Sequence, residues 1–181
     1  MHGPPGTGKT AFIRAVAQDL DLPIHVFDLA TFYNDELKKA WNNMKSSAPC
    51  IALFEDIDSV FVGRDPINEK IVLTFDALLN CVDGVERSDG VMLFATTNRL
   101  STLDSALGGQ AEGQLSRPGR INESVLFDIL DEDGRKLIAN RTLGDWPEIA
   151  RHAVIRGQGD TGDQFERRCI DLAQELFWGA A

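Results

Sequence analysis

Apolar residues recur at helical spacing in some stretches of the first 130 residues and form short runs in others. The helical spacing predicts three helices, over residues 9–20, from Asn34 onward and over 70–85. The short runs are bounded by polar or turn residues and predict strands at 23–30, 50–54, 91–98 and 124–130. Strands that alternate with helices favour a parallel sheet with helices on both faces.

The pattern changes after residue 130, where helical spacing continues without intervening strands. Further helices are predicted at 131–143, 146–154 and 161–178. Thr161 and Gln164 have the spacing of a capping box that starts the last of them. The sequence thus predicts an α/β core over residues 1–130 and a small all-helical segment over residues 131–181.

The composition narrows the class of protein without identifying it. Of the 181 residues, 43% are apolar, which is enough for a sizeable core. Lys and Arg total 18 against 28 Asp and Glu, and the formal net charge of −10 argues against a broad surface that binds nucleic-acid phosphates. No apolar run approaches the roughly 20 residues of a membrane span, so no membrane segment is expected. Three cysteines without metal-ligand spacing (Cys50, Cys81 and Cys169) are predicted to be buried thiols in a reducing compartment.

A phosphate-binding sequence stands almost at the first residue. Residues 3–10 read GPPGTGKT and match the pattern G-x-x-x-x-G-K-[ST]. Glycines let successive backbone N–H groups point at one anion, and the start of the following helix adds its dipole. Lys9 is expected to reach the β- and γ-phosphates, and the Thr10 hydroxyl to bind Mg²⁺. The predicted nucleotide-binding residues are Pro4, Pro5, Gly6, Thr7, Gly8, Lys9 and Thr10.

Acidic residues follow the apolar run 50–54 directly. Ligands of parallel α/β sheets bind at the carboxyl ends of the strands, so Glu55 and Asp56 are expected beside the phosphate-binding loop. One acid can hold Mg²⁺ through water, and the next can polarise the attacking water. The alternative is an ordinary solvated acidic turn.

Two further groups could act on the phosphates. Asn98 ends the predicted strand 91–98, where its amide could orient the lytic water; an Asx turn that ends the strand is the alternative. Arg117 and Arg120 lie in the sequence SRPGR, and arginines on such a loop can reach out of their own subunit and stabilise the transferring phosphate. The alternative for these two is a pair of solvated surface cations.

The order of these pieces resembles that of an AAA ATPase domain, from residue 3 to about residue 178. GPPGTGKT resembles the Walker A motif, EDIDSVFVGR the Walker B segment with its trailing arginine Arg64, and ATTN the sensor-1 motif that ends in Asn98. LDSAL and SRPGR are similar to the arginine-finger loop, and TGDQFERRC to the lid helix that begins near the nucleotide. The resemblance implies a P-loop NTPase fold: an α/β three-layer parallel sheet, here lacking its first strand, followed by an all-helical lid.

One branch of the family has a narrower likeness to this chain. Most members have Asp-Glu at the Walker B tip, whereas this chain has Glu55-Asp56. The swapped pair, together with LTFDALLNCVDGV, is similar to the branch whose known member translocates the Rieske iron–sulfur protein in mitochondria. The resemblance implies that Glu55 is the acid on the magnesium side, with Thr10, and that Asp56 faces the water.

The chain departs from the family pattern in several places. The strand that precedes Walker A in the family, and the nucleotide-contacting linker before it, are not found in the sequence. We expect either an N-terminally truncated fragment of a longer protein, which we favour, or a strand from elsewhere or from a partner that fills the gap. The Gly-rich GGQAEGQLS lengthens the finger loop and could misplace Arg117 and Arg120.

The resemblance implies Mg²⁺-dependent binding and hydrolysis of ATP in a homo-oligomeric ring, a hexamer or heptamer, that remodels or translocates a protein client. A nucleotide-binding module without useful hydrolysis, with a regulatory or structural role, is the first alternative. A DNA-directed loader is the second, although the acidic charge disfavours a nucleic-acid partner. The expected location is the cytoplasm, or the matrix side of a mitochondrial membrane if a parent protein carries an upstream anchor.

Overall fold

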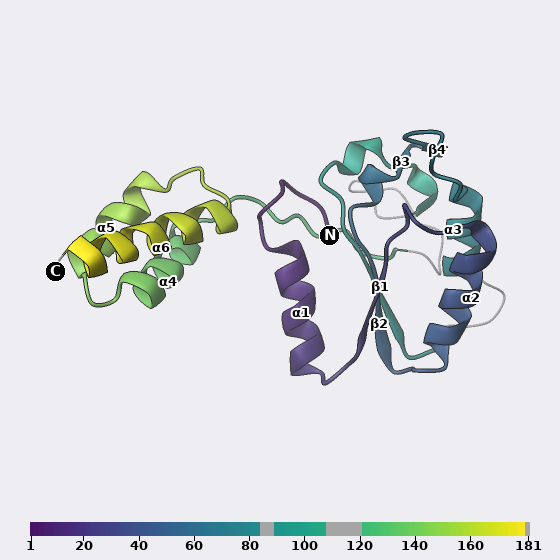
Figure 1. Cartoon of the computed structure of the whole chain (residues 1–181), viewed down its shortest axis with the longest axis horizontal. Helices are drawn as coiled ribbons and strands as arrows, with labels where there is room; N and C mark the ends of the chain where they lie inside the picture. Colours follow the sequence, from purple (N-terminus) through teal and green to yellow (C-terminus); the bar gives the residue numbers. More distant parts are fainter. Residues whose placement is uncertain (84–88, 108–120, 180–181) are drawn as a thin grey trace. The chain divides into compact units, whose positions relative to one another are not determined.

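The computed structural model describes residues 1–83, 89–107 and 121–179, and the chain divides into two compact units (Figure 1). The first unit comprises Met1–Gly3 and Lys9–Leu126, and the second comprises Pro4–Gly8 and Phe127–Ala181. The α/β core that the sequence predicts lies in the first unit, and the helices predicted after residue 130 lie in the second. The fold class predicted from the sequence is therefore confirmed.

A three-stranded parallel sheet lies at the centre of the first unit, in the order β1-β2-β5. The strands are β1 (Ile24–Phe27), β2 (Cys50–Phe54) and β5 (Val91–Ala95). In the register of the sheet, Phe54 pairs with Phe27 on one side and with Ala95 on the other. All five residues of β2 are buried, as expected of a continuous apolar run between two neighbouring strands.

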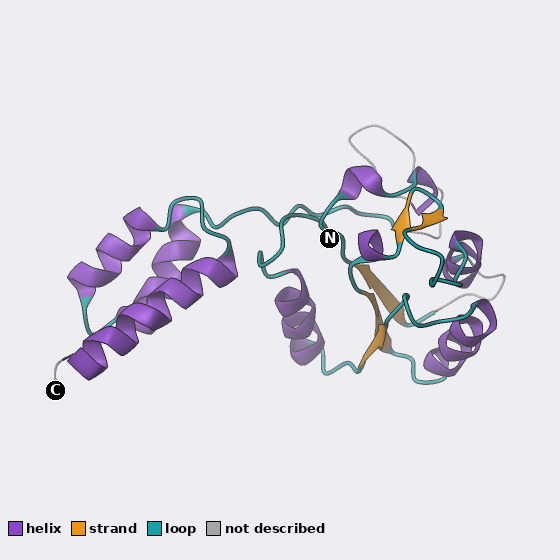
Figure 2. Cartoon of the chain, turned by 45° about the horizontal axis from the view of Figure 1, so that its top comes forward, coloured by secondary structure: helices purple, strands orange, loops and turns teal. Residues whose placement is uncertain are grey.

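Helices cover both faces of this sheet, with α1 (Lys9–Asp19) on one side and α2 (Asn34–Lys45) and α3 (Phe75–Val82) on the other (Figure 2). Successive residues of β2 contribute to two different cores because side chains of a strand alternate between faces. Ile51 packs in the same cluster as Ile13 of α1. Phe54 packs with Trp41 of α2, at 5.7 Å between ring centroids. The result is the predicted three-layer arrangement.

The starts of α2 and α3 are connected by a hydrogen bond. Asn34 is the first residue of α2, as predicted, and its Oδ1 accepts from the backbone N–H of Thr74 at 2.9 Å instead of capping its own helix. The helix predicted over 70–85 begins only at Phe75, because the Thr74 hydroxyl accepts from Ala77 N at 3.2 Å and acts as the N-cap. Asn34 thus links the start of one helix to the cap of the next.

Short elements follow the ends of β2 and β5. The 3₁₀ turn η1 (Ile57–Ser59) leads into a two-stranded antiparallel hairpin, β3 (Phe61–Val62) and β4 (Asp65–Pro66). After β5 come two more 3₁₀ turns, η2 (Leu100–Thr102) and η3 (Ser105–Leu107). The acidic residues of the predicted Walker B segment therefore lie on tight turns rather than on a long loop.

The strand predicted over 124–130 is wrong. In this segment the structure has one isolated bridge, between His2 and Leu126, supported by a hydrogen bond from His2 N to Val125 O at 2.9 Å. His2 also bridges Thr97, so Met1–Gly3 lies between the end of β5 and this segment. A strand needs a hydrogen-bonded neighbour along its length, and among the described residues the bridge to His2 is the one β-bridge of this segment. Leu126 is 58% exposed.

The second unit contains three helices, α4 (Glu132–Leu143), α5 (Pro147–Arg156) and α6 (Gly162–Gly179). Their core includes Leu143, Ala153 and Phe165. The predicted capping box is confirmed, because Thr161 N donates to Gln164 Oε1 at 3.0 Å and Gln164 N donates to Thr161 Oγ1 at 3.5 Å. All three cysteines of the chain are free and buried, as predicted. No helix among the described residues is both long and apolar enough to span a bilayer.

Candidate active site

The carboxyl ends of β2 and β5 lie side by side, because the two strands are parallel neighbours. Glu55 and Asp56 leave the end of β2, and Asn98 lies three residues after the end of β5. Lys9 and Thr10 form the first turn of α1 in the same unit. Each of these five residues is predicted from the sequence and is hydrogen-bonded to at least one of the others.

Lys9 lies at the centre of this cluster and is 7% exposed. Its Nζ donates hydrogen bonds to Gly3 O at 2.8 Å and to Asn98 Oδ1 at 2.9 Å. Burial lowers the pKa of Lys9, while the negative charges of Asp56 and Asp58 act in the opposite direction. The ammonium group is therefore held by neutral carbonyl oxygens with two carboxylates nearby.

Asn98 connects Lys9 to Asp56. Its Nδ2 donates to Asp56 Oδ1 at 3.3 Å, while its Oδ1 accepts from Lys9. An amide can do both because it carries an acceptor and two donors. An Asx turn that ends the strand was the alternative expected for Asn98 from the sequence. The contacts of its side chain with Lys9 and Asp56 are not those of an Asx turn.

Asp56 has left-handed backbone geometry, with φ of 46° and ψ of 54°. This conformation costs an L-residue roughly 1–2 kcal/mol, although Asp tolerates it better than most. Thr96 provides the compensating contacts: its Oγ1 accepts from Asp56 N at 2.9 Å, and its O accepts from Ile57 N at 3.0 Å. These two hydrogen bonds hold the backbone of Asp56 in the tight turn that follows Glu55.

Thr10 and Glu55 form a separate pair. The Thr10 hydroxyl donates to Glu55 Oε1 at 2.9 Å. Mg²⁺ prefers oxygen ligands, keeps several waters, and is bound in nucleotide sites through one or two protein groups and the phosphates. Among the described residues no group of three or more His, Cys, Asp or Glu could hold a metal ion. A hydroxyl and a carboxylate in contact suit Mg²⁺ that takes its other ligands from phosphate and water.

The loop Pro4–Gly8 has the backbone freedom that an anion cradle requires. Gly6 and Gly8 have φ of +77° and +93°, which L side chains rarely adopt. Within the part of the chain that the structure describes, the N–H groups of Gly6, Thr7 and Gly8 have no hydrogen-bond acceptor. Free amides on a glycine-rich loop directly before a helix suit a phosphate group.

This loop is also tied to the helical residues of its own unit. The carbonyl of Gly6 accepts a hydrogen bond from Asp163 N, at the start of α6, at 2.9 Å. A Cβ built on Gly6 would lie 3.0 Å from Thr161 Oγ1. Gly6 is therefore needed both for its backbone conformation and for its close approach to the start of α6.

Asp58, Thr96 and Thr97 belong to the cluster, although the sequence did not assign them a role. Asp58 is 7% exposed and its Oδ1 accepts from Thr97 Oγ1 at 2.8 Å and from Asn98 N at 2.9 Å. The sequence features that could have indicated these residues are the third acid in EDID and the two threonines before Asn98. Neither pattern shows by itself that the two turns bind each other.

Other predicted site residues are not brought into this cluster. Arg117 and Arg120 lie outside the described residues. Arg64 forms an exposed ion pair with Asp104 at 3.0 Å, and this hydrogen-bonded contact raises the pKa of Arg64. The pair joins the turn after β3 to the segment LDSAL in the same unit.

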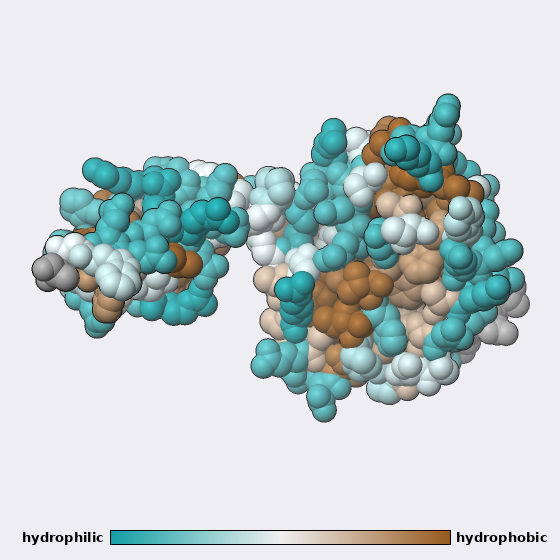
Figure 3. All heavy atoms as spheres, viewed as in Figure 1, coloured by the Kyte–Doolittle hydropathy of each residue, from teal (hydrophilic) through white to brown (hydrophobic). Residues whose placement is uncertain are grey.

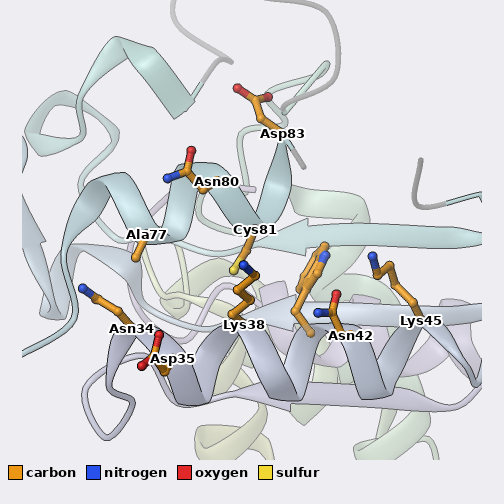
Figure 4. A pocket seen from close by; sticks show the side chains of 10 residues that line it. Asn34, Asp35, Lys38, Asn42, Lys45, Ala77, Asn80, Cys81 and Asp83 are labelled. Carbon is orange, nitrogen blue, oxygen red and sulfur yellow. The ribbon is translucent and has the colours of Figure 1, made fainter. Parts of the chain in front are cut away.

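A groove of about 550 Å³ lies between α2 and α3, away from the predicted motifs (Figure 4). Lys38, Lys45 and Cys81 are among its lining residues, and no residue of the predicted nucleotide site lines it. Burial raises the pKa of the Cys81 thiol, which keeps it protonated. Lysines and aspartates both line the groove, so it has no marked charge of either sign.

Comparison with known proteins identifies the family of the chain. The profile of the "ATPase family associated with various cellular activities (AAA)" matches residues 1–118. The "Probable mitochondrial chaperone bcs1" of Schizosaccharomyces pombe is 38% identical over 83% of this chain and 32% of its own length.

Two further relatives are the "ATP-dependent zinc metalloprotease FtsH 3" of Synechocystis and the "Cell division cycle protein 48 homolog" of Archaeoglobus fulgidus. The first is 34% identical over 90% of this chain and 27% of its own length. The second is 33% identical over 76% of this chain and 19% of its own length. The chain thus spans a third or less of each of these relatives. With more than half of its residues matching the family profile, the chain belongs to the AAA family of ATPases.

Proposed function

We propose that the chain binds Mg·ATP on residues 3–10 and hydrolyses it as part of an assembly that remodels or translocates a protein. The observation that supports this most strongly is the hydrogen-bonded series Lys9–Asn98–Asp56, next to the pair Thr10–Glu55. It combines a cation for phosphate, an amide and an acid for water, and oxygen ligands for a metal. Membership of the AAA family supports the same reaction.

Lys9 and Asn98 have complementary tasks in this proposal. Lys9 Nζ exchanges the carbonyl of Gly3 and the amide of Asn98 for phosphate oxygens when the nucleotide binds. Asn98 Oδ1 is then free to accept a hydrogen bond from a water molecule, while its Nδ2 stays near Asp56. Asp56 accepts the proton of that water or orients it for attack on the γ-phosphorus.

Thr10 and Glu55 would hold Mg²⁺, Thr10 directly and Glu55 through its carboxylate or a bound water. A cation held by these two residues would supply positive charge against the negative charge that develops on the phosphate. The Thr10 hydroxyl uses its proton in the bond to Glu55, so a lone pair of its oxygen would remain for the metal. Both residues reach this position from rigid elements, the first turn of α1 and the end of β2.

Assembly into a ring of identical subunits is part of the proposal. The lengthened loop with Arg117 and Arg120 would act on the nucleotide of a neighbouring subunit, as the family resemblance implies. The first unit leaves apolar side chains such as Val62, Ile67 and Val72 exposed, and Figure 3 shows apolar surface on this unit. Exposed apolar surface of this kind is common where subunits associate.

A protein client is favoured over nucleic acid. The relatives at 33–38% identity include a protein described as a chaperone and one described as a protease. The formal charge of −10 opposes contact with a phosphate backbone. The likeness to a protein described as a mitochondrial chaperone favours remodelling or translocation of a protein as the work performed.

A second candidate is a nucleotide-binding module without useful hydrolysis. It is favoured by Asp56, which is one methylene shorter than the Glu usual in the family and already bonded to Asn98. Phosphate release by the chain, measured with saturating Mg·ATP, decides between the candidates. Hydrolysis by this site predicts that the wild-type chain releases phosphate faster than Lys9→Ala does, and that EDTA abolishes this phosphate release. Nucleotide binding without such release would instead support the module.

A further inference from the structure

We propose that Asp58 is a positioning residue whose carboxylate fixes the backbone of Thr97 and Asn98 and thereby sets the place of the Asn98 amide between Lys9 and Asp56. The inference rests on the proposed function, because it assigns Asp58 a task in the same site. Asp58 itself contacts neither phosphate nor water in this scheme. It acts only through the turn that carries Asn98.

The contacts of Asp58 support this role. Its Oδ1 accepts from Thr97 Oγ1 at 2.8 Å and from the backbone N–H of Asn98 at 2.9 Å. The side chain is almost completely buried. A buried carboxylate must be hydrogen-bonded or paired, and bonds to an ionised acceptor are shorter and stronger than neutral ones. The position of the Asn98 backbone is therefore tied closely to that of Asp58.

The charge of Asp58 is satisfied mainly by these neutral donors. Arg99 forms an ion pair with its other oxygen, with Nε 3.9 Å from Oδ2, and the Arg99 side chain is 74% exposed. A pair of this length with a solvated partner contributes little. Asp58 also influences the charge of Lys9, whose Nζ donates hydrogen bonds to Gly3 O and to Asn98 Oδ1. The bonds to Thr97 and Asn98 are thus the specific contacts.

Asp58 is not required merely to hold the two turns together. Thr96 already joins them, because it accepts hydrogen bonds from Asp56 N and from Ile57 N. Among the described residues, Thr96 makes no such contact with Asn98. The distinctive contribution of Asp58 is that its carboxylate accepts a hydrogen bond from Asn98 N. Removal of the Asp58 carboxylate should therefore release Asn98 while the ends of β2 and β5 stay connected.

Kinetics of four variants of the chain test this proposal: Asp58→Ala, Asp58→Asn, Asn98→Ala and the double variant Asp58→Ala/Asn98→Ala. For Asp58→Ala we expect kcat to fall on the order of 10-fold, less than when a proton-transfer group itself is removed. The Kd of Mg·ATP should change by less than about threefold, because Lys9 and Thr10 are intact. Asp58→Asn keeps an acceptor oxygen and should restore kcat to within about threefold of the wild type.

The double variant separates positioning from an independent effect. If Asp58 acts through Asn98, the double variant is no slower than Asn98→Ala alone. Losses that multiply would overturn the proposal. An unchanged kcat in Asp58→Ala, or an Asp58→Asn variant as slow as Asp58→Ala, would overturn it as well.

Hydrogen exchange at single amides provides a readout that does not depend on hydrolysis. The N–H of Asn98 should exchange at least about tenfold faster in Asp58→Ala, and that of Ile57 should keep its protection, because local openings are measured residue by residue. Asp58→Ser, whose hydroxyl is too short to reach Asn98 N, replaces Asp58→Ala if the latter does not fold. Unchanged exchange at Asn98 refutes the positioning role. A wild-type chain that releases no phosphate refutes hydrolysis, while the exchange data still decide the role of Asp58.

Discussion

The side chain of Asn98 accepts a hydrogen bond from Lys9 Nζ at 2.9 Å, although 89 residues separate the two in the sequence. The bond uses Asn98 Oδ1, which would otherwise accept a hydrogen bond from water, and Lys9 Nζ, which would otherwise bind phosphate. In the proposed mechanism both groups are released by the same event, because Lys9 leaves Asn98 when it binds the nucleotide. The arrival of phosphate is thus coupled to the positioning of water.

Replacement of Asp56 by Asn should keep nucleotide binding and abolish turnover. Asn is nearly isosteric and tolerates the left-handed geometry at this position, but it cannot accept a proton. We expect the Kd of Mg·ATP to stay within about threefold and phosphate release to fall by at least about 100-fold. Fluorescent-nucleotide titration and a phosphate-release assay measure the two quantities. Asp65→Asn, an exposed acid in β4, serves as the control, and equal turnover in Asp56→Asn would refute the assigned role.

The affinity for nucleotide should fall as pH rises, and the fall should begin at a lower pH than it would if Lys9 had the pKa of an ordinary lysine. Burial lowers the pKa of Lys9 in the free protein, whereas bound phosphates would raise it. Binding then takes up a proton at any pH between the two pKa values, so affinity falls as pH rises above the lowered one. Titrations of Mg·ATP at several pH values give the profile. In Lys9→Met the decline should be absent, and an identical decline there would assign it to another group.

Gly6→Ala should weaken nucleotide binding. The new Cβ would be strained at φ +77° and would lie 3.0 Å from Thr161 Oγ1, so the loop backbone has to move. We expect the Kd of Mg·ATP to rise about tenfold, which corresponds to about 1.4 kcal/mol. Gly159→Ala is the matched control, because Gly159 has φ +95° but no atom within 4 Å of a new Cβ. Equal effects of both variants on Kd would show that backbone strain alone, and not the place of Gly6, is responsible.

Arg135→Met should destabilise the helical unit. Arg135 is buried in α4, and its guanidinium donates to Val154 O at 3.0 Å and to Leu130 O at 2.5 Å. Met retains much of the apolar stem but leaves two carbonyl groups without a donor, at about 1–3 kcal/mol for each buried group. Chemical denaturation followed by far-UV circular dichroism measures the loss. Lys136→Met changes an exposed neighbour and should cost less than about 0.5 kcal/mol.

Local sequence patterns predicted much of the fold and of the site because they report on local physics. The run 50–54 is apolar at every position, and it forms the strand that is covered on both faces. The acids after it and Asn98 after the next strand were expected together, because neighbouring parallel strands end at the same edge. The structure joins Asn98 to both Asp56 and Lys9.

The remaining features depend on neighbours that no local pattern reveals. Residues 124–130 have the composition of a strand, but among the described residues their one β-bridge is to His2, and a strand forms only where a partner pairs along it. Asn34 has the chemistry of a helix cap but binds Thr74, which is 40 residues away. The role of Asp58 likewise depends on a turn 40 residues further along the chain.

Calorimetric titration of the wild-type chain and of Lys9→Ala with a non-hydrolysable ATP analogue and Mg²⁺ tests the central claim most directly. The account predicts saturable one-site binding to the wild type, weakened at least about tenfold in EDTA and in Lys9→Ala, because the charge-assisted bonds of Lys9 to phosphate are lost. A folded wild-type chain that binds no magnesium nucleotide, or one whose affinity is unchanged by Lys9→Ala, would contradict it.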